Sequence, residues 1–186
     1  VQTSLIPTAQ SANVIAEIRG HAAPEEVVVI GAHLDSWDLG TGAVDDGAGV
    51  GITMAAMALI KEAGLVPRRT IRLVLWGAEE VGLLGALAYR DQHRAELANH
   101  IMGSESDFGG GRVWKLTADS QSDAGDQLLA RVAAILAPLG IAPGSNKQPG
   151  GGPDLMPLVS VGVPTFRLHQ DGRDYFDLHH TADDTV

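Results

Sequence analysis

The chain has 186 residues, of which 45% are hydrophobic and 19% charged, the usual balance for one globular domain with a substantial core. Its formal net charge of −10 and the lack of a long basic run argue against nucleic acid or a membrane as partner, and no apolar run could cross a bilayer. No cysteine is present, which excludes disulfides and leaves His, Asp and Glu as metal ligands.

Strands and helices are expected to alternate along the chain. Alternating or β-branched apolar runs predict strands at 13–19, 27–32, 70–76, 101–105, 113–117 and 163–168. Helices are expected in the apolar segment that follows the glycine-rich stretch 40–51 and stops at Gly64, over 81 to about 99, and over 126–139. This order predicts an α/β three-layer sandwich, with a mixed, mostly parallel central sheet and helices on both faces. Residues 1–186 are expected to form a single domain.

Histidine and acidic residues recur just after the predicted strands, where sheets of this type bind ligands. In chain order they are His33 with Asp35, Asp45, Glu79 with Glu80, Asp107, and His180 near the end of the chain. Each has a structural alternative, namely a hydrogen-bonded histidine, a helix cap, a helix N-terminus, a turn or an exposed terminus. One shared metal site explains all five places at once, whereas the structural alternatives need five separate explanations.

Spacing suggests how some of these side chains work together. His33 and Asp35 lie two apart on an extended segment, so the carboxylate of Asp35 is expected to hold the imidazole in one orientation. Asp46 is expected to cap the helix that follows it. The adjacent Glu79 and Glu80 can divide the work, one binding a metal while the other moves a proton.

With these motifs in place, the chain resembles the co-catalytic dizinc exopeptidases, the family of zinc aminopeptidases and glutamate carboxypeptidases. It looks closest to the plasma glutamate carboxypeptidase branch, also called carboxypeptidase Q. The resemblance runs from about residue 13 to 185 and is carried by the stretches 31–38, 43–47, 67–70, 75–80 and 105–107. It implies the zinc exopeptidase fold. It also implies that the chain is truncated relative to a full-length protein, because the family's final helix is missing.

The resemblance further implies two zinc ions per chain, bridged by the carboxylate of Asp45. One zinc would be completed by His33 and Asp107, and the other by Glu80 and His180. The peptide bond that follows Asp45 is expected to be cis, as in the family.

Glu79 matches the family's general base, which would take a proton from a water between the zincs as that water attacks a peptide carbonyl. The implied activity is hydrolysis of dipeptides or of the terminal residues of short peptides. The alternatives are an aminopeptidase proper, although Pro153-Asp154-Leu155 departs from the Ser-Asp-His of many aminopeptidases, and a non-catalytic receptor or scaffold.

The expected partner is a small peptide substrate, with no nucleic acid and no membrane, and the oligomeric state is left open. A secreted or periplasmic location is expected from the resemblance alone, since the chain shows no signal peptide.

Overall fold

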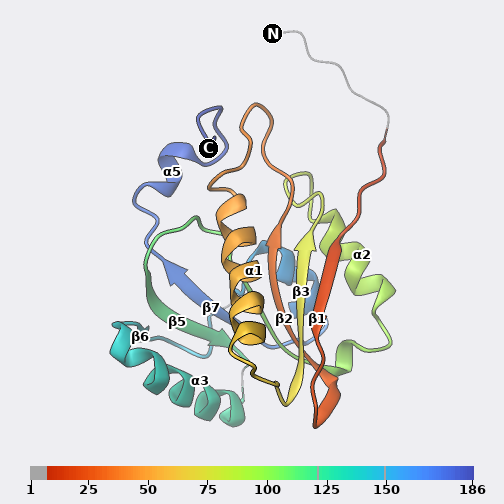
Figure 1. Ribbon diagram of the computed structural model, residues 1–186, viewed down its shortest axis with the longest axis vertical. Coiled ribbons are helices and arrows are strands. Elements are labelled where there is room, and N and C mark those ends of the chain that lie inside the picture. The colour runs from red at the N-terminus through yellow and green to blue at the C-terminus, as the bar shows by residue number, and fades with distance from the viewer. Residues whose placement is uncertain (1–7, 121, 149) are drawn as a thin grey trace.

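A computed structural model describes residues 8–120, 122–148 and 150–186. Within them a mixed seven-stranded sheet has the order β1-β3-β2-β4-β7-β5-β6 (Figure 1). The strands are β1 (Val14–Ile18), β2 (Ala23–His33), β3 (Arg69–Trp76), β4 (His100–Glu105), β5 (Val113–Asp119), β6 (Ala142–Pro143) and β7 (Thr165–Gln170). The β1–β3 and β5–β7 pairs are antiparallel and the others are parallel, which confirms the predicted mixed sheet.

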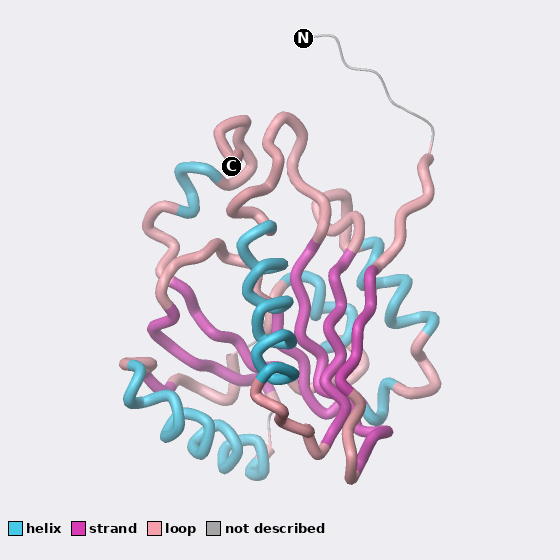
Figure 2. Tube along the Cα trace, in the orientation of Figure 1, coloured by secondary structure: helices cyan, strands magenta, loops and turns pink. Residues whose placement is uncertain are grey.

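Helices cover both faces of this sheet (Figure 2). They are α1 (Gly47–Glu62), α2 (Leu84–Gln92), α3 (Asp123–Leu136), α4 (Met156–Val159) and α5 (Tyr175–Leu178), with 3-10 turns at Leu97–Asn99, Ala137–Leu139 and Pro153–Leu155. None of these helices combines the length and apolarity needed to cross a membrane.

Strand alternation decides which side chains meet which helix. Leu73 and Leu75 of β3 lie in a cluster with residues of α1, whereas Val74 and Trp76 lie in the cluster formed by α2 and α4. A third cluster joins α3 to β5 and β7. The sheet is therefore buried on both faces, as its nearly continuous apolar strands predict.

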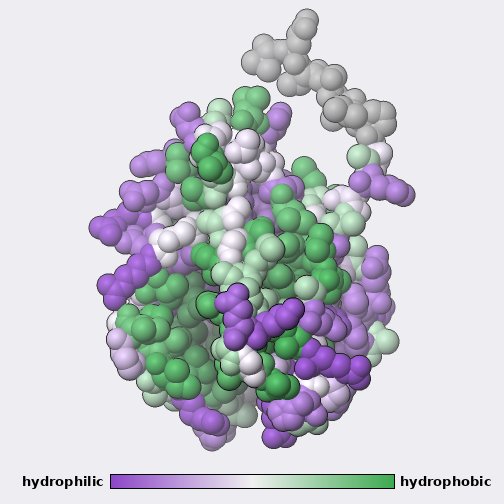
Figure 3. Space-filling view, in the orientation of Figure 1, coloured by the Kyte–Doolittle hydropathy of each residue, from purple (hydrophilic) through white to green (hydrophobic). Residues whose placement is uncertain are grey.

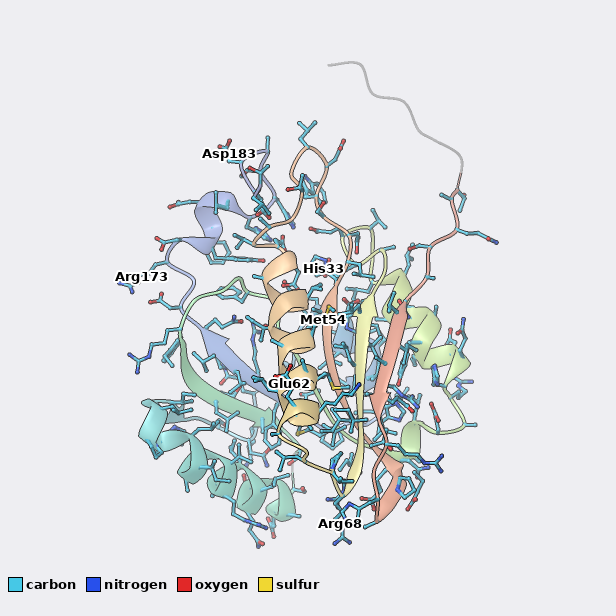
Figure 4. The ribbon with its side chains drawn as sticks, in the orientation of Figure 1. His33, Met54, Glu62, Arg68, Arg173 and Asp183 are labelled. Carbon is cyan, nitrogen blue, oxygen red and sulfur yellow. The ribbon has the colours of Figure 1, made fainter. Side chains whose placement is uncertain are left out.

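Parallel pairing brings the carboxyl ends of three strands to one edge. His33 at the end of β2 is paired with Trp76 at the end of β3, and Gly31 is paired with Glu105 at the end of β4. The segments that follow these strands therefore emerge side by side. In Figure 4, His33 lies at this edge, beside the start of α1, with Asp183 at the same end of the molecule.

The helix expected from 81 to about 99 is shorter in the structure. Ala78 and Leu83 have positive φ, as does Gly82, so the chain makes a tight turn before α2 begins at Leu84. The helix expected at 126–139 starts earlier, at Asp123, because Ser122 accepts a hydrogen bond from the backbone of Gly125 as its N-cap. In the loop expected at 149–153, residue 149 lies outside the described residues and Pro153 opens a 3-10 turn.

Helix α1 is apolar on its outer side as well as toward the sheet. Ile52, Met54 and Leu59 remain 44%, 51% and 64% exposed. Hydrophobic side chains cover much of this face of the molecule (Figure 3). A solvated helix usually carries polar residues on its outer side, so α1 departs from the ordinary amphipathic pattern.

Candidate metal centre

His33 is held rigidly at the end of β2. Its backbone N–H donates to the carboxylate of Asp46 at 3.1 Å, and its ring Nδ1 lies 2.8 Å from the backbone carbonyl of Asp35. The residue is 2% exposed, and its ring turns Nε2 toward the carboxylates of Asp45, at 3.2 Å, and Asp107, at 3.7 Å. Because the Nδ1 contact fixes the ring, Nε2 is the nitrogen that faces the site.

The loop that carries Asp45 is fixed from both sides. The Asp45–Asp46 peptide bond is cis, as the resemblance implied. Asp46 caps α1 by accepting from the backbone of Gly49, which confirms the predicted N-cap. From the other side, the carboxylate of Asp184 accepts the backbone N–H groups of Val44 at 2.7 Å and Asp45 at 3.1 Å. The end of the chain thus positions the central carboxylate.

The turn after β3 is held by Asp35, in a way that differs from the sequence-based expectation. The two oxygens of its carboxylate accept the backbone N–H groups of Glu79, at 2.9 Å, and Glu80, at 3.1 Å. The imidazole of His33 is bonded instead by the backbone carbonyl of Asp35, and the nearest carboxylate oxygen is 3.8 Å away. Asp35 therefore orients the glutamate turn more directly than it orients the histidine.

Asp107 and His180 complete the constellation from opposite sides. Asp107 follows β4 by two residues, and its Oδ1 faces His33. The Nε2 of His180 lies 2.9 Å from Oε2 of Glu80 and 3.4 Å from Oδ2 of Asp45. Its ring is stacked on Trp37, with centroids 4.7 Å apart. The aromatic contact restrains a histidine that is otherwise among the more exposed members of the site.

Six of the seven residues singled out in the sequence line one cavity of about 350 Å³. They are His33, Asp45, Glu79, Glu80, Asp107 and His180. The seventh, Asp35, does not line it and acts on the turn behind it. Two further lining residues, Tyr175 and His179, were missed from the sequence. Nε2 of His179 lies 3.5 Å from Oδ2 of Asp45, and the adjacent histidine pair was the only signal for it.

The charges of the site shift several pKa values. Burial acts to lower the pKa of His33, but the nearby carboxylates of Asp107 and Asp45 outweigh it and raise that pKa to about 12. Burial acts to raise the pKa of Asp45, but hydrogen bonds from His33 and Tyr175 hold it below its usual value. Burial, with the charge of Asp107 added, raises the pKa of Glu79 to about 7. The cavity is strongly anionic and favours a cation at its centre.

Unpartnered oxygens test whether these residues fit metal ions. Among the described residues, Asp45 Oδ2, Glu80 Oε1 and Asp107 Oδ1 are buried without a hydrogen-bond partner. Donor atoms of His33, Asp45 and Asp107 lie within 4.8 Å of one another. A buried carboxylate oxygen left without a partner is costly, and a bound cation removes that cost. The residues fit a metal centre of nitrogen and oxygen ligands.

The comparison with family models decides the family. Residues 13–186 match the model described as peptidase family M28. The chain belongs to peptidase family M28. As an M28 chain it is 41% identical over 180 residues to carboxypeptidase Q of Bos taurus, which covers 97% of this chain and 38% of the relative. The resemblance inferred from the sequence is thereby confirmed.

Solved structures agree with this M28 assignment. A peptidase M28 precursor from Shewanella amazonensis is 49% identical, with a TM-score of 0.88 over 93% of this chain and 39% of the other. A zinc aminopeptidase from Bacillus subtilis, 24% identical, has a TM-score of 0.70 over 92% of this chain and 44% of the other, which shows a shared fold. The chain thus spans less than half the length of these relatives.

Proposed function

We propose that this chain holds two zinc ions and hydrolyses dipeptides or the terminal residues of short peptides. The observation that carries the proposal is the carboxylate of Asp45. Its Oδ1 faces His33 Nε2 at 3.2 Å, and its Oδ2 faces His180 Nε2 at 3.4 Å. Zinc binds imidazole and carboxylate ligands, and a carboxylate with one histidine at each oxygen can join two ions.

The proposed ligands divide around that carboxylate. His33 and Asp107 would hold one ion, Glu80 and His180 the other, and Asp45 both. When bound, the zinc ions would polarise the peptide carbonyl and stabilise the charge that develops on its oxygen. The assignment of Glu80 and His180 to the same ion is supported by the 2.9 Å distance between Glu80 Oε2 and His180 Nε2.

Glu79 is the proposed general base. Its carboxyl lines the cavity with the proposed ligands, while its neighbour Glu80 faces His180. Glu79 would accept a proton from the attacking water and return it to the departing amine. Burial raises the pKa of Glu79 to about 7, which suits a group that must gain and lose a proton near neutral pH. Asp35 would keep the group in place through the backbone of the same turn.

Action at chain ends is supported by the relatives. The name carboxypeptidase Q and the name zinc aminopeptidase both describe enzymes that act at the ends of peptides. A member that acts on the amino end remains the second candidate, since the aminopeptidase shares the fold. A panel of dipeptides and of peptides blocked at either end separates the two activities.

The experiment is a dipeptide assay run with zinc, with a chelator, and after zinc is restored. We expect Glu79→Gln to lower kcat at least about 100-fold, since a general base contributes 10²–10⁴-fold, while the zinc content stays unchanged. Glu62→Gln, at the far end of α1 (Figure 4), is the matched control and should be fully active. Less than one zinc per chain without chelator-sensitive hydrolysis would instead indicate a non-catalytic receptor or scaffold.

A further inference from the structure

A second cavity, of about 440 Å³, adjoins the candidate metal centre. The two cavities share four lining residues, Asp107, Pro153, Tyr175 and His179. A peptide whose scissile bond lies at the metal centre would therefore place a neighbouring group in the second cavity. Residues specific to this cavity decide which groups are accepted there.

Aromatic rings form one wall of the second cavity. Phe108 is stacked on Tyr175 with centroids 4.6 Å apart, and it meets Phe176 edge-on at 5.5 Å. Met156 adds a flexible apolar side chain. Such walls hold the hydrocarbon part of a substrate and reduce the water around any charged group beside them.

Arg167 brings a positive charge to this apolar cavity. It lies on β7, where Phe166 packs into the cluster under α3, so by alternation Arg167 faces the other side of the sheet. Its guanidinium carbon is 6.0 Å from the ring centroid of Phe108. Within the described part of the chain, the ion-paired arginines are Arg69, Arg72, Arg90 and Arg173. Arg167 has no carboxylate partner there.

We propose that Arg167 binds a carboxylate of the peptide substrate in the second cavity. The inference rests on the proposed peptidase function and adds a substrate class to it. A guanidinium forms paired, charge-assisted hydrogen bonds with a carboxylate, and the aromatic wall strengthens them by limiting water. The net charge of −10 repels anions in general, so a local cation with no carboxylate partner among the described residues is a selective anchor.

The carboxylate can come from two sources with the same chemistry, the free α-carboxylate of a short peptide or the side chain of Asp or Glu. Three substrate pairs separate them. Glu-Ala with Gln-Ala and Ala-Glu with Ala-Gln test the side chain at each position. Ala-Ala with Ala-Ala-amide tests the terminus. The members of each pair differ chiefly in the negative charge.

The variants are Arg167→Gln, which removes the charge, and Arg167→Lys, which keeps it without the planar fork. Arg173→Gln is the matched control, because Arg173 is exposed and already paired with Asp171. We expect Arg167→Gln to lower kcat/KM about tenfold or more for the charged member of one pair, through KM, as hydrogen bonds to a charged group predict. For the neutral member of that pair, kcat/KM should change less than about twofold. The kcat/KM of Arg167→Lys for the charged member should lie between those of the wild type and Arg167→Gln.

A binding measurement separates failure of this inference from failure of the proposed function. Calorimetry on the same proteins would use the same pairs with the peptide bond reduced to a CH₂–NH link, which cannot be hydrolysed. If the wild type hydrolyses no dipeptide, the proposed function fails, yet a preference for the charged analogue that Arg167→Gln abolishes still supports the role of Arg167. Equal losses for the charged and neutral members of all three pairs, or no change in any pair, would overturn it.

Discussion

Asp35→Asn tests how the glutamate turn is positioned. In the structure the Asp35 carboxylate accepts two backbone N–H groups, from Glu79 and Glu80, one at each oxygen. The asparagine side chain keeps the shape but replaces one oxygen by an NH₂ group. One of the two backbone N–H groups then faces the NH₂ group of the asparagine, which is also a donor. The remaining hydrogen bond is no longer made to a charged carboxylate.

The size of the effect follows from these two bonds. A hydrogen bond to a charged group contributes about 1.5–3 kcal/mol, and a backbone N–H left unsatisfied costs a similar amount. The Asp35 side chain is 28% exposed, so water replaces part of the loss and the lower end of the range applies. At about 1.4 kcal/mol for each factor of ten, kcat should fall about ten- to thirtyfold. KM should change little, because Asp35 does not line the cavity.

The assay is kcat and KM for a dipeptide at saturating zinc, with zinc content and circular dichroism measured on the same samples. Asp38→Asn is the control, because Asp38 lies on the same loop, is exposed, and among the described residues its side chain bonds just to the backbone N–H of Leu39 beside it. A folded Asp35→Asn protein with wild-type kcat would refute the positioning role.

Three further outcomes are expected. Asp184→Asn should cost about 2 kcal/mol of unfolding free energy, measured in urea, because the buried carboxylate accepts two backbone N–H groups at Asp45 and its neighbour; an unchanged midpoint would contradict this. Burial lowers the pKa of His100, so the unfolded chain binds more protons than the folded one and stability falls as pH drops below about 6.5. The stability difference between wild type and His100→Gln should therefore shrink between pH 7.5 and 5.5. A constant difference would contradict this role of His100. Trp37→Ala should weaken zinc binding about three- to tenfold by removing the ring stacked on His180, as dialysis against graded zinc concentrations would show. Equal zinc affinities of the two proteins would show that the stacking does not support the zinc site.

The strand ends of the site could be predicted from the sequence because local patterns specify them. The predicted strands ended one residue before His33, three before Glu79 and two before Asp107, and the parallel sheet brought those ends to one edge. The cap on α1 followed from Asp46 standing before a helical segment. Each of these features depends on residues a few positions apart.

The features that were missed depend on long-range contacts or very short elements. Asp35 bonds a turn 44 residues away, and only the pairing of β2 with β3 brings the two together. Tyr175 opens the four-residue helix α5 and His179 follows it, and this helix is too short to show a helical period. The second cavity around Arg167 depends on which face of β7 meets the loop after β4, and the sequence alone does not specify it.

The central claim is that five side chains hold a pair of zinc ions joined by Asp45. An anomalous-scattering map at the zinc absorption edge, from crystals of the zinc-loaded protein, tests it most directly. The account predicts two peaks roughly 3.5–4 Å apart, the separation usual in two-metal sites, with one oxygen of Asp45 at each. A single peak, or two peaks that Asp45 does not join, would contradict it.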